Sequence, residues 1–176
     1  MALRLLTMVA LALLGCGGSQ PVPQMPRNLP AVGTQVPALS RVDQRGQVVA
    51  LRAGTPTLLY FFPKAGTPGC TQEACAIRDA WDDYQLSKLR VVGVSIDTDE
   101  EHRVFTKAHG LPFSLVSDPS HAWSDAFGVG TFNGLDERVS FLIDTNDRIV
   151  KSYVDVDPGV HAQEVLRDAK ALGLIP

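Results

Sequence analysis

Apolar and polar positions along this 176-residue chain change their spacing from one segment to the next. Three continuous apolar runs lie at 57–62, 90–96 and 139–143, and such runs are typical of strands buried on both faces of a sheet. Between the first two runs, apolar residues recur three or four positions apart. That spacing places them on one face of a single predicted helix: Cys70, Ala74, Ile77, Trp81 and Tyr84.

Shorter patterns predict the remaining elements. Two strand-like segments, 39–42 and 47–51, flank a turn that ends at Gly46 and predict a hairpin. An alternating segment at 149–154 follows a polar turn and predicts an edge strand. Three more helices are expected: one over 99–109 that buries Val104, Phe105 and Ala108, a short one with Trp123 and Phe127, and a last one from Asp157 whose stripe Val165, Leu166, Ala169 and Leu172 stops at Gly173.

The order of these elements indicates the fold class. Strands alternate with helices and are followed by a hairpin and a terminal helix, which predicts an α/β protein, a three-layer α/β/α sandwich with a mixed central sheet. This is the order of a thioredoxin-like domain. The length fits one domain with a sizeable core.

Composition and charge exclude several classes. Apolar residues make up 45% of the chain and charged residues 20%, which is typical of a globular protein rather than a disordered one. Sixteen Lys and Arg stand against 19 Asp and Glu with no basic block, so nucleic acid is not an expected partner. The histidines are scattered without metal-site spacing and are expected mostly at the surface, and two aspartates before a helix are expected to be caps: His102, His109, His121, His161, Asp97 and Asp99.

The N-terminus differs from the rest of the chain. Residues 5–14 form an uncharged apolar run that is too short to span a bilayer and is typical of an export signal, here 1–15. The run ends in Leu-Leu-Gly before Cys16, which resembles a bacterial lipobox and predicts lipidation of Cys16. A Pro- and Gly-rich linker over 16–33 would then join the anchor to a domain at 34–176. We therefore expect an exported lipoprotein that faces the periplasm or the cell exterior; a buried N-terminal helix is the alternative.

Candidate chemistry gathers where the first buried strand meets the first helix. Cys70 lies in the first helical turn, where unpaired backbone N–H groups and the helix dipole favour a thiolate. Pro63 and Gly66 belong to a stiff loop before it, and the Thr67 hydroxyl could bond both the sulfur and a substrate oxygen. An inert buried thiol is the alternative for Cys70.

These residues match a known family. The pattern Pro63-x-x-x-Thr67-x-x-Cys70, with Cys75 five residues further on, resembles the peroxiredoxin active-site motif, and within that family the bacterioferritin comigratory protein or peroxiredoxin Q group. Further likeness at 94–97, 111–118 and 138–144 extends the resemblance over roughly 34–176. The segment 128–137 departs from it, because it is shorter than the family's usual loop.

The resemblance implies a thiol-dependent peroxidase that reduces hydrogen peroxide and organic hydroperoxides and needs no metal or organic cofactor. Cys70 would attack the O–O bond and become a sulfenic acid. Thr67 and backbone N–H groups would hold the peroxide, Pro63 would shield the sulfur, and Arg138 would favour the thiolate. A plain surface salt bridge is the alternative for Arg138. We expect a monomer, with a thioredoxin-like dithiol as the partner that re-reduces it.

The position of Cys75 has a geometric consequence. In an ideal helix, five residues separate two Cα atoms by ~7.5 Å along the axis and ~140° around it, which is ~8.7 Å in all. A disulfide needs less than ~7 Å. Cys70 and Cys75 can therefore pair as an intramolecular disulfide only if the first turns unwind. A permanent structural disulfide is the alternative in an exported protein.

Two other functional classes remain open on the residues alone. A disulfide-exchange protein of the thioredoxin fold uses a C-x-x-C pair, which this chain lacks. A copper-binding protein of that fold would use a C-x-x-x-C pair with a distant histidine, and the spacing here is one residue longer. Consumption of peroxide, as opposed to retention of copper, separates the enzyme from the carrier.

Overall fold

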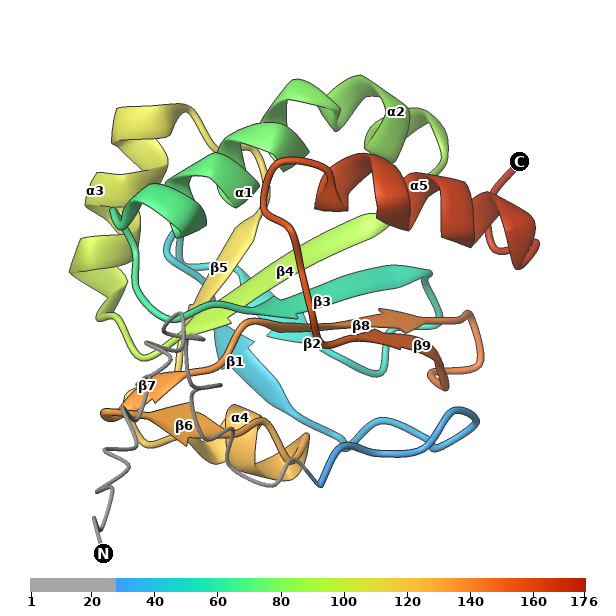
Figure 1. Cartoon of the computed structure of the whole chain (residues 1–176), viewed down its shortest axis with the longest axis horizontal. Coiled ribbons are helices and arrows are strands. Elements are labelled where there is room, and N and C mark those ends of the chain that lie inside the picture. Colours follow the sequence, from blue (N-terminus) through green and yellow to red (C-terminus); the bar gives the residue numbers. More distant parts are fainter. Residues whose placement is uncertain (1–27) are drawn as a thin grey trace, which may run out of the picture.

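A computed structural model describes residues 28–176 of the chain. At its centre is a mixed sheet in the order β5-β4-β3-β8-β9 (Figure 1). β3 lies in the middle, parallel to β4 and antiparallel to β8, while β9 is an edge strand as predicted. The three apolar runs form β3, β4 and β8, which confirms them as buried strands. The five strands are β3 (Thr57–Phe61), β4 (Arg90–Ser95), β5 (Ser114–Ser117), β8 (Val139–Ile143) and β9 (Ile149–Tyr153).

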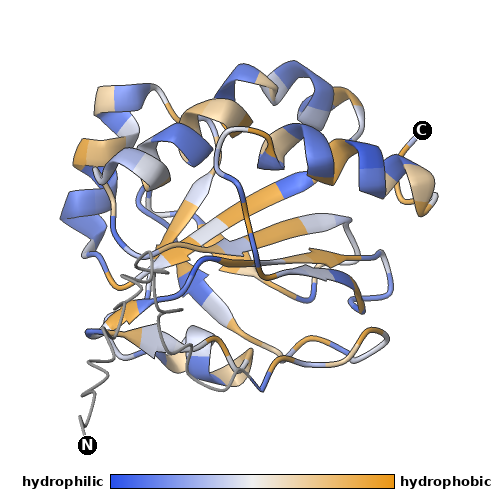
Figure 2. Cartoon of the chain, in the orientation of Figure 1, coloured by the Kyte–Doolittle hydropathy of each residue, from blue (hydrophilic) through white to orange (hydrophobic). Residues whose placement is uncertain are grey.

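Helices cover both faces of this sheet, so the predicted α/β/α sandwich is confirmed (Figure 1). Alternate side chains of β3 belong to two hydrophobic cores, one on each face of the sheet. Leu58 and Tyr60 pack under α1 and α5, whereas Leu59 and Phe61 pack on the side of α4. The central strands are largely hydrophobic in Figure 2. The helices are α1 (Pro68–Asp79), α2 (Trp81–Leu86), α3 (Asp99–His109), α4 (Ala122–Ala126) and α5 (His161–Ala171).

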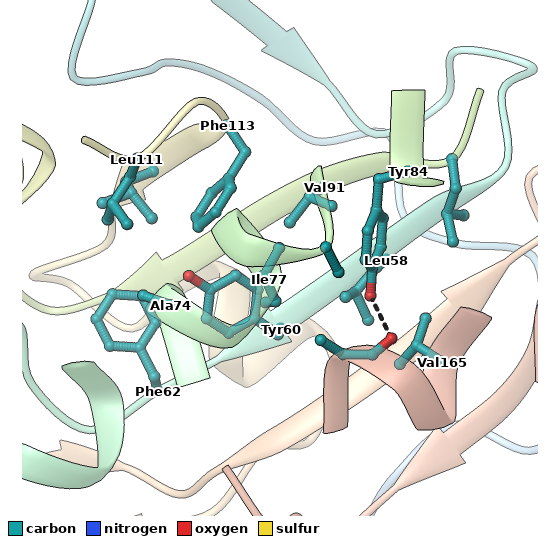
Figure 3. Packing of buried hydrophobic residues seen from close by; sticks show 14 of the residues in the cluster. Leu58, Tyr60, Phe62, Ala74, Ile77, Tyr84, Val91, Leu111, Phe113 and Val165 are labelled. Carbon is teal, nitrogen blue, oxygen red and sulfur yellow. Dashed lines mark hydrogen bonds between the residues drawn. The ribbon is translucent and has the colours of Figure 1, made fainter. Parts of the chain in front are cut away.

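The single helix expected from Cys70 to Tyr84 is in fact two helices. The break falls at Ala80, which ends α1 and precedes α2. Two contacts fix the direction of α2: the Tyr84 hydroxyl donates to the Ala162 carbonyl at 3.0 Å (Figure 3), and Trp81 packs against Phe113 at 5.9 Å between ring centroids. Tertiary packing therefore overrides a continuous helical pattern here.

The buried face of α3 also differs from the prediction. Val104 is 59% exposed and Ala108 is exposed, whereas His102 and Phe105 are buried. His102 is fully buried, and Ser95 Oγ lies 2.8 Å from its Nε2, so one of its two ring nitrogens has a hydrogen-bond partner inside the core. The prediction counted only apolar residues, so it missed that the buried face of α3 includes His102.

Smaller corrections concern the ends of elements and the histidines. α5 begins at His161 rather than at Asp157, because 157–160 form a turn in which Asp157 accepts the Gly159 N–H at 2.9 Å. Leu172 lies beyond that helix and is 48% exposed. His161 is fully buried, with its Nε2 3.0 Å from Ser140 Oγ, so the surface expectation is wrong for both it and His102.

The remaining segments are hairpins and the N-terminal stretch. Residues 28–33 contact the domain: Leu29 packs on the α4-side core, and the Gly33 N–H donates to the Ile149 carbonyl at 2.7 Å. Within 28–176 no helix is long and apolar enough to cross a bilayer. The proposed signal and Cys16 lie outside the described residues.

The predicted first hairpin is β1 (Ser40–Val42) with β2 (Val48–Ala50). The short 128–137 segment folds as a second hairpin, β6 (Thr131–Phe132) with β7 (Leu135–Asp136).

Candidate active site

The junction of β3 and α1 holds Cys70 at the start of a helix. α1 begins with Pro68 at its first position, and Thr67 is the N-cap with an extended backbone. Cys70 is the third residue of the helix and only 2% exposed. Its sulfur thus lies in the first turn, where unpaired N–H groups and the helix dipole favour negative charge in a mostly dry environment.

The sheet brings Arg138 to this sulfur. Arg138 directly precedes β8, whose Val139 pairs with Phe61 at the end of β3. Its Nη2 donates to Cys70 Sγ at 3.2 Å, and its Nη1 donates to the Glu73 carboxylate. The close approach needs a small neighbour, since a Cβ at Gly69 would come within 3.2 Å of the same Nη2. The guanidinium is thus positioned to stabilise a thiolate at Cys70.

Glu73 is a site residue that sequence reasoning missed. It follows Cys70 by three positions on the same helix face and is fully buried. Burial raises the pKa of Glu73 to about 7, while the charge and hydrogen bond of Arg138 oppose that rise. Its Oε1 has no hydrogen-bond partner among the described residues. The detectable signal was a carboxylate on the apolar face that Cys70 and Ala74 share.

The same centre contains further ionisable groups. Burial lowers the pKa of Arg138, but the charges of Glu73 and Cys70 outweigh this effect and raise it, so the guanidinium stays cationic. Tyr60 lies beneath on β3, and burial, with the charges of Glu73 and Cys70, raises the pKa of its hydroxyl well above the usual range. Phe62 stacks on the Tyr60 ring at 5.4 Å between centroids. The floor of the site is therefore aromatic and neutral.

The loop before Cys70 carries the other two predicted residues. The Thr67 hydroxyl donates its proton to the Lys64 carbonyl at 2.9 Å, a hydrogen bond within the loop. Its oxygen can still accept a hydrogen bond. Pro63 is half-buried, directly after Phe62.

Asp97, which lies just after β4, anchors this loop. Its carboxylate accepts the Ala65 N–H at 2.8 Å and the Ser95 hydroxyl at 2.7 Å. Asp97 is therefore not the helix cap that its position suggested, and Asp99 is the first residue of α3 rather than its cap. Thr98 is the N-cap of α3, in a capping box with Glu101.

Cys75 lies on another side of α1. It is half-buried, and its Sγ lies 3.9 Å from His109 Nδ1. Cys70 and Cys75 are both free thiols. Both cysteines belong to one intact helix, so this conformation holds them apart. Among residues 28–176 no group of three or more His, Cys, Asp or Glu side chains could hold a metal ion.

The site is a buried cysteine in the first turn of a helix that receives a hydrogen bond from an arginine, all on a thioredoxin-like sheet. This arrangement is that of a cysteine-dependent redox enzyme. Comparison with known proteins agrees with this class. The model of the AhpC/TSA family matches residues 32–152, and the chain belongs to that family.

Individual relatives show which group within this family the chain resembles. Peroxiredoxin Bcp of Bacillus subtilis is 36% identical over 149 residues, which cover 79% of this chain and 94% of the relative. A PrxQ mutant from Xylella fastidiosa superposes with a TM-score of 0.75 at 28% identity, covering 81% of this chain and 97% of that one. The bacterioferritin comigratory protein of Xanthomonas campestris gives 0.73 at 30% identity, covering 81% and 99%.

These relatives support assignment to the bacterioferritin comigratory protein/peroxiredoxin Q group. The protein is a thiol-dependent peroxidase of the peroxiredoxin class. The copper-binding and disulfide-exchange alternatives are not favoured.

Proposed function

We propose that Cys70 is the thiol that reduces the peroxide and that Arg138 activates it. The observation that carries this assignment is the 3.2 Å contact between Arg138 Nη2 and the buried Cys70 sulfur. Hydrogen bonds between the cation and the sulfur favour the thiolate, and the thiolate is the nucleophile. Glu73 holds the same guanidinium from the other side and so acts as a positioning residue.

The proposed first step transfers one oxygen. The Cys70 thiolate attacks one peroxide oxygen, the O–O bond breaks, and the second oxygen leaves with a proton as water or an alcohol. Thr67 and the N–H groups at the start of α1 would bind the peroxide, and Pro63 would keep bulk water from the sulfur. The substrates would be hydrogen peroxide and organic hydroperoxides; alkyl peroxide reduction is the activity described for the Xanthomonas campestris relative.

Cys75 is the proposed resolving thiol. Its sulfur attacks the sulfenic sulfur of Cys70, an S–S bond forms and water leaves. Because both residues lie in α1, the first turns of the helix must unwind before this bond can form. A thioredoxin-like dithiol would then reduce the disulfide of the monomeric enzyme.

Separate serine substitutions of the two cysteines test these roles. We expect Cys70→Ser to abolish peroxide consumption with any reductant, because the nucleophile is gone. Cys75→Ser should keep the first turnover at a near-normal rate and stop at Cys70 sulfenic acid, which excess peroxide oxidises to sulfinic acid. Rapid mixing with one equivalent of peroxide, followed by intact mass, measures both steps.

The contrary result is a reversal of the two phenotypes. If Cys75→Ser loses the rapid oxidation while Cys70→Ser keeps it, the assignment of the nucleophile is wrong. In the wild type, a loss of two hydrogens identifies the disulfide.

We also propose that the enzyme is an exported lipoprotein anchored through Cys16. The apolar run 5–14, the lipobox-like residues before Cys16 and the Pro-rich spacer support this proposal. The full-length chain should enter the membrane fraction after expression with its signal, and Cys16→Ser should lose that location. Unprocessed full-length protein in the cytosol would contradict the anchor while leaving the peroxidase assignment intact.

A further inference from the structure

The side chain of Cys75 faces a histidine from a different helix. Cys75 lies in the second half of α1, and His109 is the last residue of α3, a helix on the same side of the sheet (Figure 1). Cys75 Sγ and His109 Nδ1 are 3.9 Å apart, within reach of a hydrogen bond to sulfur. The peroxide-reducing centre around Cys70 does not use this contact.

Two neighbours hold His109 in place, one through its ring and one through its backbone carbonyl. The Phe105 ring meets the His109 ring at 67° with 5.0 Å between centroids, an edge contact one turn earlier on α3. Arg78, one turn after Cys75 on α1, donates from Nη1 to the His109 carbonyl at 2.8 Å. The end of α3 is therefore tied to α1 beside the thiol, and the guanidinium adds positive charge there.

We propose that His109 is the base that takes the thiol proton of Cys75 and so prepares it for attack on the Cys70 sulfenic acid. This inference rests on the proposed role of Cys75 as the resolving thiol. His109 contacts the reacting sulfur directly, so its role is catalytic. Arg78 is a positioning residue that acts through His109 and through its charge.

Resolution begins with a proton transfer and ends with the loss of water. The Cys75 thiol proton moves to His109 Nδ1 in the folded helix, leaving a thiolate. After the first turns of α1 unwind, the thiolate sulfur attacks the Cys70 sulfenic sulfur, the S–S bond forms and the S–O bond breaks. The leaving hydroxide takes up one proton, from the imidazolium or from solvent, so one thiol and one sulfenic acid yield one disulfide and one water.

Other charged groups surround this pair. On α1, Arg78 also forms a 2.7 Å ion pair with the exposed carboxylate of Asp79. His109 lines a surface hollow of about 310 Å³ together with Lys64, Asp97, Glu100 and Glu101. Because the hollow is open to solvent, a proton on His109 can exchange with water.

The size of the effect has an upper bound. An ordinary cysteine thiol is only ~3% ionised at pH 7, so complete ionisation could accelerate attack by at most ~30-fold. A thiolate stabilised in this way is a weaker nucleophile, which reduces the gain to ~5-fold at the lower end. At pH 9 most ordinary thiols are already ionised, so the gain falls below ~2-fold.

His109→Asn tests the proposal in single-turnover experiments between pH 6 and pH 9. The full-length protein is mixed with one equivalent of hydrogen peroxide and quenched in acid. Intact mass spectrometry then distinguishes the sulfenic acid from the disulfide. We expect sulfenic acid to form within ~2-fold of the wild-type rate and disulfide to form ~5- to 30-fold more slowly at pH 7, with the gap closing by pH 9. His121→Asn is the matched control, a part-exposed histidine paired with Asp136.

The pH profile of the wild-type disulfide step gives a second measurement that needs no folded variant. Because His109 takes the proton, the wild-type rate should already be close to its maximum at pH 7. A profile that rises through pH 8.5, equal slowing of His109→Asn at every pH, or unchanged or faster resolution by His109→Asn at pH 7 would each overturn the role of His109. A wild type that forms no disulfide would overturn the role of Cys75 as well, so the two failures are distinguishable.

Discussion

Removing the Arg138 side chain should slow the reaction of Cys70 with peroxide while leaving the fold intact. Arg138 Nη2 contacts the Cys70 sulfur at 3.2 Å, and the same guanidinium pairs with Glu73. Arg138→Ala therefore removes the cation from the thiolate and leaves a buried carboxyl without its partner. That carboxyl can take up a proton instead of unfolding the domain, because burial already raises its pKa to about 7.

The contact distance sets the magnitude of this loss. A unit charge 3.2 Å from a thiolate contributes about 5 kcal/mol at an effective dielectric constant of ~20, and this is a ceiling because Glu73 shares the cation. Measured hydrogen bonds to charged groups contribute about 1.5–3 kcal/mol. We therefore expect Arg138→Ala to oxidise ~10- to 150-fold more slowly at pH 7.

The assay is the rate of sulfenic acid formation at several peroxide concentrations, with folding checked by circular dichroism. Arg138→Lys keeps the charge but loses the two-sided contact, so its rate should lie between those of the wild type and Arg138→Ala. Arg138→Ala/Glu73→Gln should be as slow as Arg138→Ala, because Glu73 acts through the arginine. Arg167→Ala, at an exposed arginine, is the surface control. A folded Arg138→Ala that reacts at the wild-type rate would refute the reasoning.

Two further predictions concern stability. Because folding raises the pKa of Glu73 from its ordinary 4.5 to about 7, its contribution is fully present below pH 4.5 and is lost as the pH rises through 7. Urea unfolding should show a decline of up to about 3 kcal/mol over that window that Glu73→Gln lacks, and equal pH slopes would contradict it. Gly93→Ala would place a Cβ 2.7 Å from Leu115 and Tyr60, so we expect a loss of about 1–3 kcal/mol; unchanged stability in urea would show that β4 relaxes freely.

Local patterns were sufficient for much of the fold. β3, β4 and β8 lie where the apolar runs predicted them, because a continuous apolar run can bury both faces only inside a sheet. The predicted position of Cys70 in the first turn of a helix is also confirmed. A Pro and Gly loop that follows a strand specifies this placement locally.

Patterns failed where a polar residue is buried or a helix changes direction. The α3 prediction favoured Val104 over His102, because hydropathy cannot register that Ser95 pairs with one nitrogen of the buried ring. The break at Ala80 was hidden for a similar reason, since the contacts that turn α2 come from residues distant in sequence.

The sequence alone determined which segments are strands and helices and which cysteine begins a helix, because short-range spacing and backbone preferences encode those features. Only the tertiary structure decided which groups surround the sulfurs. The antiparallel register of β8 on β3 brings Arg138 to Cys70 across 68 positions, and the packing of α3 on α1 brings His109 to Cys75 across 34. Such pairings depend on how whole elements bury their apolar faces against one another, and no local pattern records that arrangement.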